Sequence, residues 1–239
     1  MDLSAPIYRL KRQAKTIART EEVPLHTALD RVAQSEGFAS WSHLSASQTS
    51  DSPAKRLLQN LQPGELILLA ARPGHGKTLL ALETLLTATQ NGQQAFFFTL
   101  DYGPADIAAR LVELGFDPAP DSFVSDTSDD ICAAYILDRL RDAPRGSLAA
   151  VDYMQLLDQR RSLPPLEDQI ADLSAGAQRL GVTILLISQI SRAYDPQAKP
   201  LPDLSDVNLP NPVDLAHFAR GCFLQDGKVR LTALGGAVS

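Results

Sequence analysis

Cysteine, aromatic residues and long hydrophobic runs are all scarce in this chain of 239 residues. The two cysteines, Cys132 and Cys222, are not spaced from each other or from the four histidines in a way that suggests a zinc site. We expect both to be buried small apolar residues. Apolar stretches such as residues 182–187 are much shorter than the ~20 residues of a membrane-spanning helix, and the first ten residues lack a signal-peptide core. A cytoplasmic protein without membrane contact is expected.

The formal charge of −6 is unevenly distributed. Residues 1–50 carry six basic and five acidic side chains, whereas the rest of the chain carries 16 basic and 23 acidic ones. Nonspecific nucleic-acid binding depends on neutralising phosphates, so an acidic main body argues against it. A local basic patch remains compatible with this balance. Hydrophobic residues make up 44% of the chain, which is enough for an ordinary globular core.

Residues 1–46 are expected to form a small helical accessory module. Apolar residues recur at helical spacing from Ile7 to Ile17, and a second apolar face runs from Pro24, which suits a helix start, to Gly37, which suits a helix end. Three residues should pack back onto these helices: Phe38, Trp41 and Leu44. Four basic residues lie largely off the first apolar stripe: Arg9, Arg12, Lys15 and Arg19. They are read as a solvated face, with nucleic-acid contact as the alternative.

Residues 47–56 are expected to be a linker because Ser, Asp and Pro are frequent there, and residues 57–239 a larger α/β domain. Strands are expected at residues 66–70, 95–100, 148–152, 183–188, 216–224 and 229–233, and helices near residues 77–90, 104–115, 129–142 and 165–180. This alternation predicts a mainly parallel sheet flanked by helices. Asp226-Gly227 indicates a hairpin between the last two strands.

The segment from Ala71 to Thr78 follows an apolar strand and opens a helix, which is the context of a P-loop. Backbone amides at the helix start bind phosphate, Lys77 adds a full charge, and the hydroxyl of Thr78 suits magnesium. Ala71 stands where the simplest pattern has its first glycine. The predicted ATP-binding residues are Arg72, Pro73, Gly74, His75, Gly76, Lys77 and Thr78. His75 is expected to fill the loop and point away from phosphate, with contact to nucleotide or a neighbour as the alternative.

Two further candidates end apolar strands. Asp152 follows residues 148–151, and a carboxylate at the carboxyl tip of a parallel strand is placed to support magnesium. Gln189 ends the next strand and would act as a polar sensor near the γ-phosphate. A strand terminus without a ligand is the alternative interpretation of Gln189.

Several segments together resemble the motor domain of DnaB-type bacterial replicative helicases. These segments are Pro63–Leu66, Ala70–Pro73, Gly76–Thr78, Asp152–Leu157, Ile187–Arg192 and Asp203–Asp206. The similarity runs from about Leu57 to Leu231 in the family's order. It implies a RecA-like fold that binds ATP, and in that family ATP is hydrolysed at subunit interfaces of a ring that moves along single-stranded DNA.

Three departures from the family pattern bear on activity. Asp101 stands where the family has the glutamate that activates water; it can act as the general base, but it is one methylene shorter. The last strand continues through residues 230–236 where the family carries a Lys-x-Arg finger reaching the neighbouring subunit. Lys228 and Arg230, which precede this point, are read as solvated strand charges, with substitution for the finger as the alternative. Residues 1–50 do not resemble the family's N-terminal domain.

The loops expected to face DNA carry few basic residues. Arg160 and Arg161 are the basic residues of the first, and residues 192–212 combine two basic residues with three acidic ones and five prolines. The second segment is therefore expected to be an ordered surface or docking loop rather than a track for DNA.

These observations predict a magnesium-dependent, slow ATPase with Lys77, Asp101, Asp152 and Gln189 at its centre. Two alternatives stay open: a true helicase or translocase acting as a ring on single-stranded DNA, and a noncatalytic ATP-dependent switch. The partners considered are a homo-oligomeric ring, weakly bound single-stranded DNA, and a protein that contacts residues 1–46 or the 192–212 loop.

Overall fold

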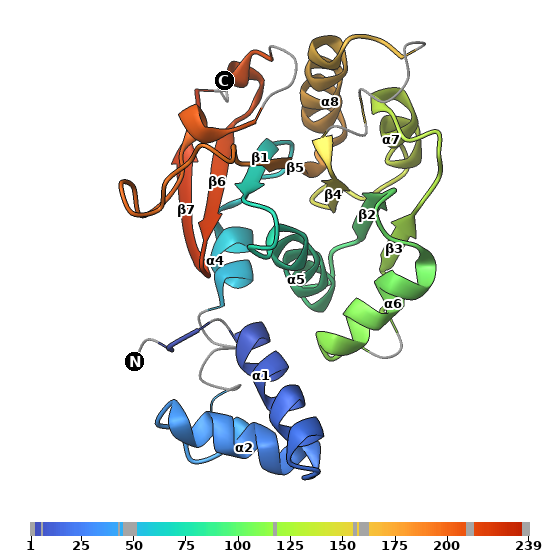
Figure 1. Cartoon of the computed structure of the whole chain (residues 1–239). Coiled ribbons are helices and arrows are strands. Elements are labelled where there is room, and N and C mark those ends of the chain that lie inside the picture. Colours follow the sequence, from blue (N-terminus) through green and yellow to red (C-terminus); the bar gives the residue numbers. More distant parts are fainter. Residues whose placement is uncertain are drawn as a thin grey trace. The chain divides into compact units, whose positions relative to one another are not determined.

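The chain divides into two compact units, Met1–Arg56 and Leu57–Ser239. The computed structural model describes residues 3–5, 7–42, 44, 52–116, 119–154, 157, 163–208 and 213–235. Within these ranges, none of the helices combines the length and the apolar character needed to cross a membrane. Figure 1 labels the helices and strands of both units.

The smaller unit is built from two helices, α1 (Ile7–Thr20) and α2 (Leu25–Ser35). Their facing sides, together with Leu44 from the residues that follow, form a core of fully or almost fully buried residues: Leu10, Ala14, Ala28, Val32, Ala33 and Leu44. Phe38 and Trp41 pack partly buried against this core, which confirms the predicted return of the chain onto the helices. The Trp41 amide donates to Asp30 Oδ1 on α2 at 2.8 Å and fixes this return. Gly37, with a φ of +85°, follows the end of α2 as the sequence predicted.

The larger unit contains a seven-stranded sheet with the order β3-β2-β4-β5-β1-β6-β7. Its strands are β1 (Leu66–Ala71), β2 (Ala95–Thr99), β3 (Phe123–Asp126), β4 (Leu148–Asp152), β5 (Thr183–Gln189), β6 (Arg220–Gln225) and β7 (Lys228–Ala233). All neighbouring pairs are parallel except β6 and β7, which form an antiparallel hairpin. The hairpin turns at Asp226 and Gly227, both with positive φ, as their sequence indicated.

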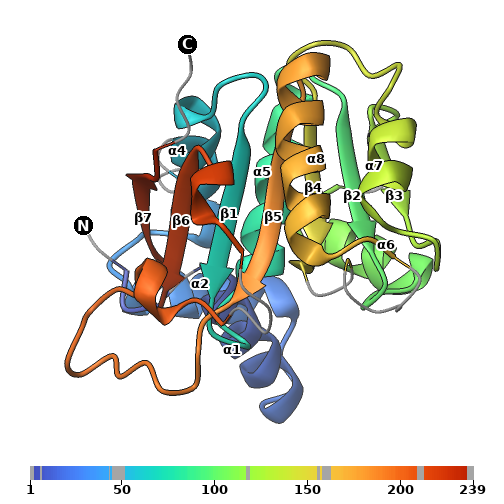
Figure 2. The same ribbon diagram turned by 90° about the horizontal axis from the view of Figure 1, so that it is seen from above.

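The helices of this unit are α4 (Pro53–Asn60), whose first residues belong to the smaller unit, α5 (Lys77–Gln90), α6 (Pro104–Glu113), α7 (Ala133–Arg139) and α8 (Leu166–Leu180). Leu66 and Leu68 join a core that lies beneath α7 and α8. Since side chains alternate along a strand, Ile67 and Leu69 face the opposite side, which α5 covers. Figure 2 shows α5 and α8 on opposite faces of the sheet, an arrangement that confirms the predicted α/β class.

Several predicted bounds differ from the structure. The edge strand β3 was not predicted, because its four residues are only partly buried and lack an apolar run. Helix α4 begins inside the expected linker. The strand expected from residue 216 begins at Arg220, because residues 215–217 form a 3-10 turn whose Ala216 amide donates to the Asp214 side chain.

The two cysteines have different environments. Cys222 is fully buried in β6, and its burial raises the pKa of the thiol to about 12. Cys132, which precedes the first turn of α7, is only half-buried. The expectation that both are buried was therefore wrong for Cys132.

Candidate functional site

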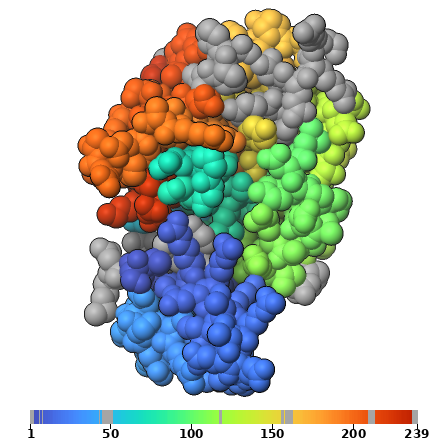
Figure 3. All heavy atoms as spheres, in the orientation of Figure 1, coloured from blue at the N-terminus to red at the C-terminus, as the bar shows by residue number. Residues whose placement is uncertain are grey.

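The loop between β1 and α5 has the backbone of a phosphate cradle. Gly74 and Gly76 adopt φ values of +79° and +86°, a left-handed conformation that glycine adopts without strain. Gly76 is the N-cap of α5, and within this described segment no side chain caps the helix start. The amides of the first turn are therefore available to an anion, with the helix dipole pointing its positive end at the loop. In Figure 3 this turquoise segment lies at the surface, between the orange segment near residue 200 and the green segment near residue 105.

Thr78 and Asp152 meet at the base of this loop. Thr78 Oγ1 donates a hydrogen bond to Asp152 Oδ2 at 2.7 Å, and both residues are buried. Thr78 lies in the first turn of α5, and Asp152 is the last residue of β4. The fold thus joins two residues that are 74 positions apart in sequence, as the prediction for Asp152 required.

The electrostatic setting of Asp152 combines burial with nearby cations. Burial raises the pKa of its carboxyl, and the Thr78 hydrogen bond and the charges of Lys77 and Arg110 act in the opposite direction. The negative charge of Asp101 adds to the rise. A carboxylate in this setting is stabilised by an added cation. A hydroxyl and a carboxylate in contact at a helix start supply the oxygen ligands that Mg²⁺ prefers, so these residues fit a magnesium site.

Asp101 lies just after the end of β2, which is the strand next to β4. Its side chain is exposed, and its amide donates to Thr99 Oγ1 at 3.1 Å. Thr99 is paired in register with Asp152, which places Asp101 at the same edge of the sheet as the Thr78–Asp152 pair. Its charge also contributes to raising the pKa of Tyr153, although burial is the larger cause there.

Two residues near Asp101 were missed by the sequence analysis. Thr99 is fully buried and holds the backbone of Asp101 through its hydroxyl. Arg110 on α6 stacks over the ring of Tyr102 with its guanidinium carbon 4.3 Å from the ring centre, and its charge acts on Asp152. The position of Thr99 at the end of an apolar strand could have indicated its place at the site. The sequence held no such signal for Arg110, nine residues after Asp101, because only the fold of α6 brings it back to the site.

Gln189 ends β5 opposite Ala71, the last residue of the strand that leads into the P-loop. Ile184 and Leu186 face α7 and α8, so by alternation Gln189 lies on the sheet face covered by α5. Asp152 lies on that same face, because Val151 beside it faces α7 and α8. The structure thus places Gln189 at the sheet edge that carries Asp152 and the P-loop. Its side chain is half-buried.

His75 lies against the turn of the last hairpin. Its Nδ1 is 3.5 Å from Asp226 Oδ1, and the buried Gln225 donates from Nε2 to Asp226 Oδ2 at 2.9 Å. This contact with another segment matches the alternative interpretation of His75, in which the side chain contacts a neighbour instead of only filling the loop. The β6–β7 turn therefore lies next to the phosphate loop, although the two are far apart in sequence.

Arg230 is held within its own chain. Its Nη2 donates to the carbonyl oxygens of Leu201 at 3.1 Å and Pro202 at 2.5 Å. These contacts differ from the expected solvated strand charge, because the side chain reaches across to the segment that follows β5. Lys228, at the start of β7, is exposed as expected.

The segment from residue 191 to 208 is ordered by its own contacts. Lys199 Nζ lies 2.6 Å from carboxylate oxygens of both Asp203 and Asp206. These ion pairs raise the pKa of Lys199, and the pKa of Asp203 is lowered to about 2, chiefly by its hydrogen bond from Lys199. The hydroxyl of Tyr194, a buried residue, donates to the Lys199 carbonyl at 2.6 Å. The segment is thus the ordered surface element that was predicted, with its lysine neutralised.

Some predicted residues lie outside the described part of the chain. Arg160 and Arg161, the basic residues of the first expected DNA loop, are among them, as are residues 209–212 at the end of the second.

A family model described as "DnaB-like helicase C terminal domain" matches residues 51–115. Similar curated proteins include the replicative DNA helicase DnaB of Leifsonia xyli, which is 26% identical over 184 residues, covering 63% of this chain and 40% of that protein. The DnaB helicase of Rhodothermus marinus is 31% identical over 183 residues, covering 61% of this chain and 19% of the relative. The chain therefore spans well under half the length of these relatives.

Two solved structures share the fold. A DnaB-like replicative helicase, studied with its primase interactions, aligns with a TM-score of 0.57 at 18% identity, over 90% of this chain and 65% of that one. A second solved structure, of an ATPase domain, aligns with a TM-score of 0.54 at 19% identity, over 76% of this chain and 80% of the other. The larger unit thus shares its fold with these DnaB-like and ATPase domains, and residues 51–115 are similar in sequence to the C-terminal domain of DnaB-like helicases.

Proposed function

We propose that the chain binds ATP with magnesium and hydrolyses it slowly, as a cytoplasmic protein. The observation that carries this proposal is the 2.7 Å contact between Thr78 and Asp152 at the start of α5, beside Lys77 and an uncapped helix terminus. Buried threonine and aspartate side chains that meet at the edge of a phosphate loop have a direct use in holding a metal–nucleotide pair. The relatives named as helicases support the same assignment.

Each residue has a distinct role in the proposed site. The α5 amides and Lys77 bind the phosphates, and Thr78 and Asp152 hold magnesium, which when bound neutralises phosphate charge. Asp101 accepts a proton from the attacking water, since it is exposed at the same strand edge. Gln189 contacts the outer phosphate region from β5.

Slow turnover follows from two features of the chain. Asp101 is one methylene shorter than the glutamate of the related family, and an error of about 1 Å in placing a catalytic group costs about 100-fold in rate. Arg230 donates hydrogen bonds to Leu201 and Pro202 of its own chain, so it is not placed to act as an arginine finger on a neighbouring subunit. A trans-acting arginine typically contributes about 10³- to 10⁵-fold to phosphoryl transfer.

Lengthening Asp101 tests its role as general base. Asp101→Glu should raise ATP turnover, by up to about 100-fold, because the longer side chain restores reach to the attacking water. Asp101→Asn should lower turnover and leave nucleotide affinity unchanged, because an amide cannot accept the proton. Both are measured by phosphate release and by calorimetry. Unchanged turnover in both variants would show that Asp101 is not the general base.

A DNA helicase acting as a ring is the second candidate, favoured by the names of the curated relatives. Against it stand the acidic main body, the Lys199 charge that is neutralised by two aspartates, and the engagement of Arg230 within its own chain. A ring would bring several copies of a sparse basic surface together and strengthen DNA binding through avidity. The molecular mass of the protein in solution with ATP and magnesium, which reports its oligomeric state, should therefore be measured alongside every assay.

We expect the isolated chain not to separate duplex DNA at physiological salt. Stimulation of its ATPase by single-stranded DNA should be weak and should decline only gradually as salt rises, because few phosphates are neutralised. A forked fluorescent duplex with ATP and magnesium provides the assay. ATP-driven strand separation would place the helicase function first.

A noncatalytic ATP-dependent switch is a third candidate. The contact of His75 with Asp226 links the phosphate loop to the last hairpin, and Arg230 on that hairpin links it to residues 201 and 202. A protein partner of the 192–212 loop would sense nucleotide through these contacts. ATP-dependent partner binding without turnover distinguishes this function from the first two.

A further inference from the structure

The proposed general base, Asp101, is not held in place by its own side chain. Within the described residues its carboxylate accepts no hydrogen bond and forms no ion pair, and the side chain is exposed. Its amide donates to Thr99 Oγ1 at 3.1 Å, which fixes the backbone on the side of β2. The position of the carboxylate therefore depends on how the chain is held on the other side, at Tyr102.

Tyr102 is held by Arg110. The guanidinium carbon of Arg110 lies 4.3 Å from the centre of the Tyr102 ring, well inside the limit of about 6 Å for a cation–π contact. Both side chains are half-buried, and in the described part of the chain neither makes a hydrogen bond or an ion pair. The stack is therefore the specific contact that orients both side chains.

Helix α6 gives Arg110 a firm base and turns it toward the site. Ile107 and Leu111, on the same side of α6 as Arg110, are only 2% and 4% exposed, so this part of the helix is anchored in the domain. Burial raises the pKa of the Asp152 carboxyl, and the charge of Arg110 is among the influences that lower it. Arg110 thus connects an anchored helix to the residue that follows Asp101.

We propose that Arg110 and Tyr102 are positioning residues, whose stack holds Asp101 where it accepts the proton of the attacking water; this inference rests on the proposed ATPase activity. Without the stack, Asp101 keeps its backbone bond to Thr99, but its carboxylate occupies a wider range of positions. An error of about 1 Å in placing a catalytic group costs about 100-fold in rate, so partial loss of order should cost about tenfold. The stack acts on Asp101 and not on the nucleotide, so ATP affinity should not change.

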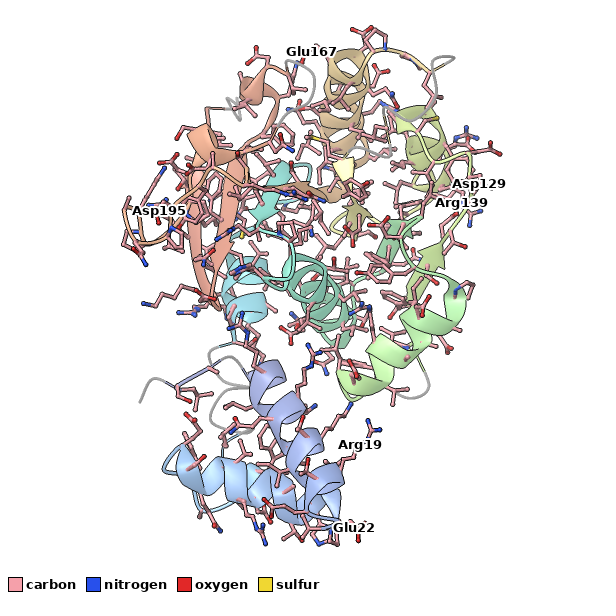
Figure 4. All side chains as sticks on the ribbon, viewed as in Figure 1. Arg19, Glu22, Asp129, Arg139, Glu167 and Asp195 are labelled. Atoms are coloured by element: carbon pink, nitrogen blue, oxygen red, sulfur yellow. The ribbon has the colours of Figure 1, made fainter. Side chains whose placement is uncertain are left out.

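Variants of the full chain separate the stack from its parts. Tyr102→Leu removes the ring and Tyr102→Phe keeps it, whereas Arg110→Gln removes the cation and Arg110→Lys keeps one. The control is Arg139→Gln, which breaks a different arginine contact of the same unit. Arg139 Nε lies 3.1 Å from Asp126 Oδ2 at the end of β3, and Figure 4 labels this arginine near that strand. Phosphate release at saturating ATP and magnesium gives kcat, calorimetry gives ATP affinity, and thermal unfolding reports stability.

We expect Tyr102→Leu and Arg110→Gln each to lower kcat by about tenfold, with ATP affinity and melting temperature unchanged. The double variant should lose no more than either single variant, because both substitutions break the same contact. Tyr102→Phe and Arg110→Lys should retain most of the turnover, since each keeps a cation over an aromatic ring. Arg139→Gln should leave kcat unchanged.

A second comparison places Tyr102→Leu in an Asp101→Asn background, with phosphate release followed over hours. There it should cause no further loss, because the residue that the stack positions no longer acts as a base. A stack that only stabilised α6 would instead lower the melting temperature and reduce turnover by the same factor in both backgrounds. That result would overturn the positioning role.

Two other results would also overturn it. Weaker ATP binding in Arg110→Gln, with normal binding in Tyr102→Leu, would show that the arginine contacts the nucleotide itself. Full turnover in both of these variants, or an equal loss in Arg139→Gln, would show that the stack has no specific effect on Asp101. Failure of the ATPase function is recognised separately, because wild-type turnover would then equal the background set by Lys77→Ala.

Discussion

Replacing Lys77 with alanine should abolish detectable ATP binding and leave the fold intact. The residue begins α5, is half-buried, and its charge reaches Asp152 at the base of the phosphate loop. Hydrogen bonds between charged partners contribute about 1.5 to 3 kcal/mol each, and a lysine facing two phosphates makes more than one. A loss of at least about 100-fold in affinity follows from those values.

Calorimetry with ATP and magnesium measures this loss directly. Lys228→Ala is the matched control, because it removes the same charge from an exposed position on β7. Thermal unfolding should be the same in both variants and the wild type. An unchanged ATP affinity in folded Lys77→Ala would place the nucleotide elsewhere on the protein.

The second large effect concerns Asp152→Asn, which should remove magnesium-dependent turnover without destabilising the chain. The amide oxygen still accepts the hydrogen bond from Thr78. Burial raises the pKa of the Asp152 carboxyl, which means that the folded state disfavours its ionised form. A neutral side chain of the same shape removes that cost, so the melting temperature should stay level or rise.

Turnover should nevertheless fall by at least about 100-fold, because a neutral oxygen is a much weaker partner for a divalent cation than a carboxylate. Phosphate release is measured over a magnesium series, together with differential scanning calorimetry. Retained turnover with wild-type magnesium dependence would show that Asp152 is only a buried strand end. A large fall in melting temperature would show that its ionised form supports the fold.

Most of the fold and the centre of the site could be predicted from the sequence because their signals are local. The glycines, lysine and threonine of the phosphate loop are contiguous, and Asp152 and Gln189 each end an apolar strand. Parallel strands bring their carboxyl ends to one edge, so both positions could be predicted to lie near the loop. The antiparallel hairpin followed from Asp226-Gly227 for the same reason, since two-residue turns need left-handed backbone.

The features that sequence reasoning missed depend on tertiary contact. The edge strand β3 has no apolar run because it is covered only in part. The approach of Asp226 to His75 joins residues about 150 positions apart, and the contact of Arg230 with Leu201 and Pro202 depends on how the segment after β5 folds back. Arg110 reaches the site only because α6 turns its side chain over Tyr102. Pattern and propensity carry no information on such pairings.

Steady-state ATP hydrolysis by the purified chain, with magnesium and with EDTA, is the measurement on which the proposed function depends most. Folded Lys77→Ala prepared in parallel sets the background. We predict turnover that depends on magnesium, exceeds this background, and stays below about 1 s⁻¹, the lower end of ordinary enzyme rates. Phosphate release equal to that of Lys77→Ala, or unaffected by EDTA, would contradict the assignment of this site as a magnesium-dependent ATPase.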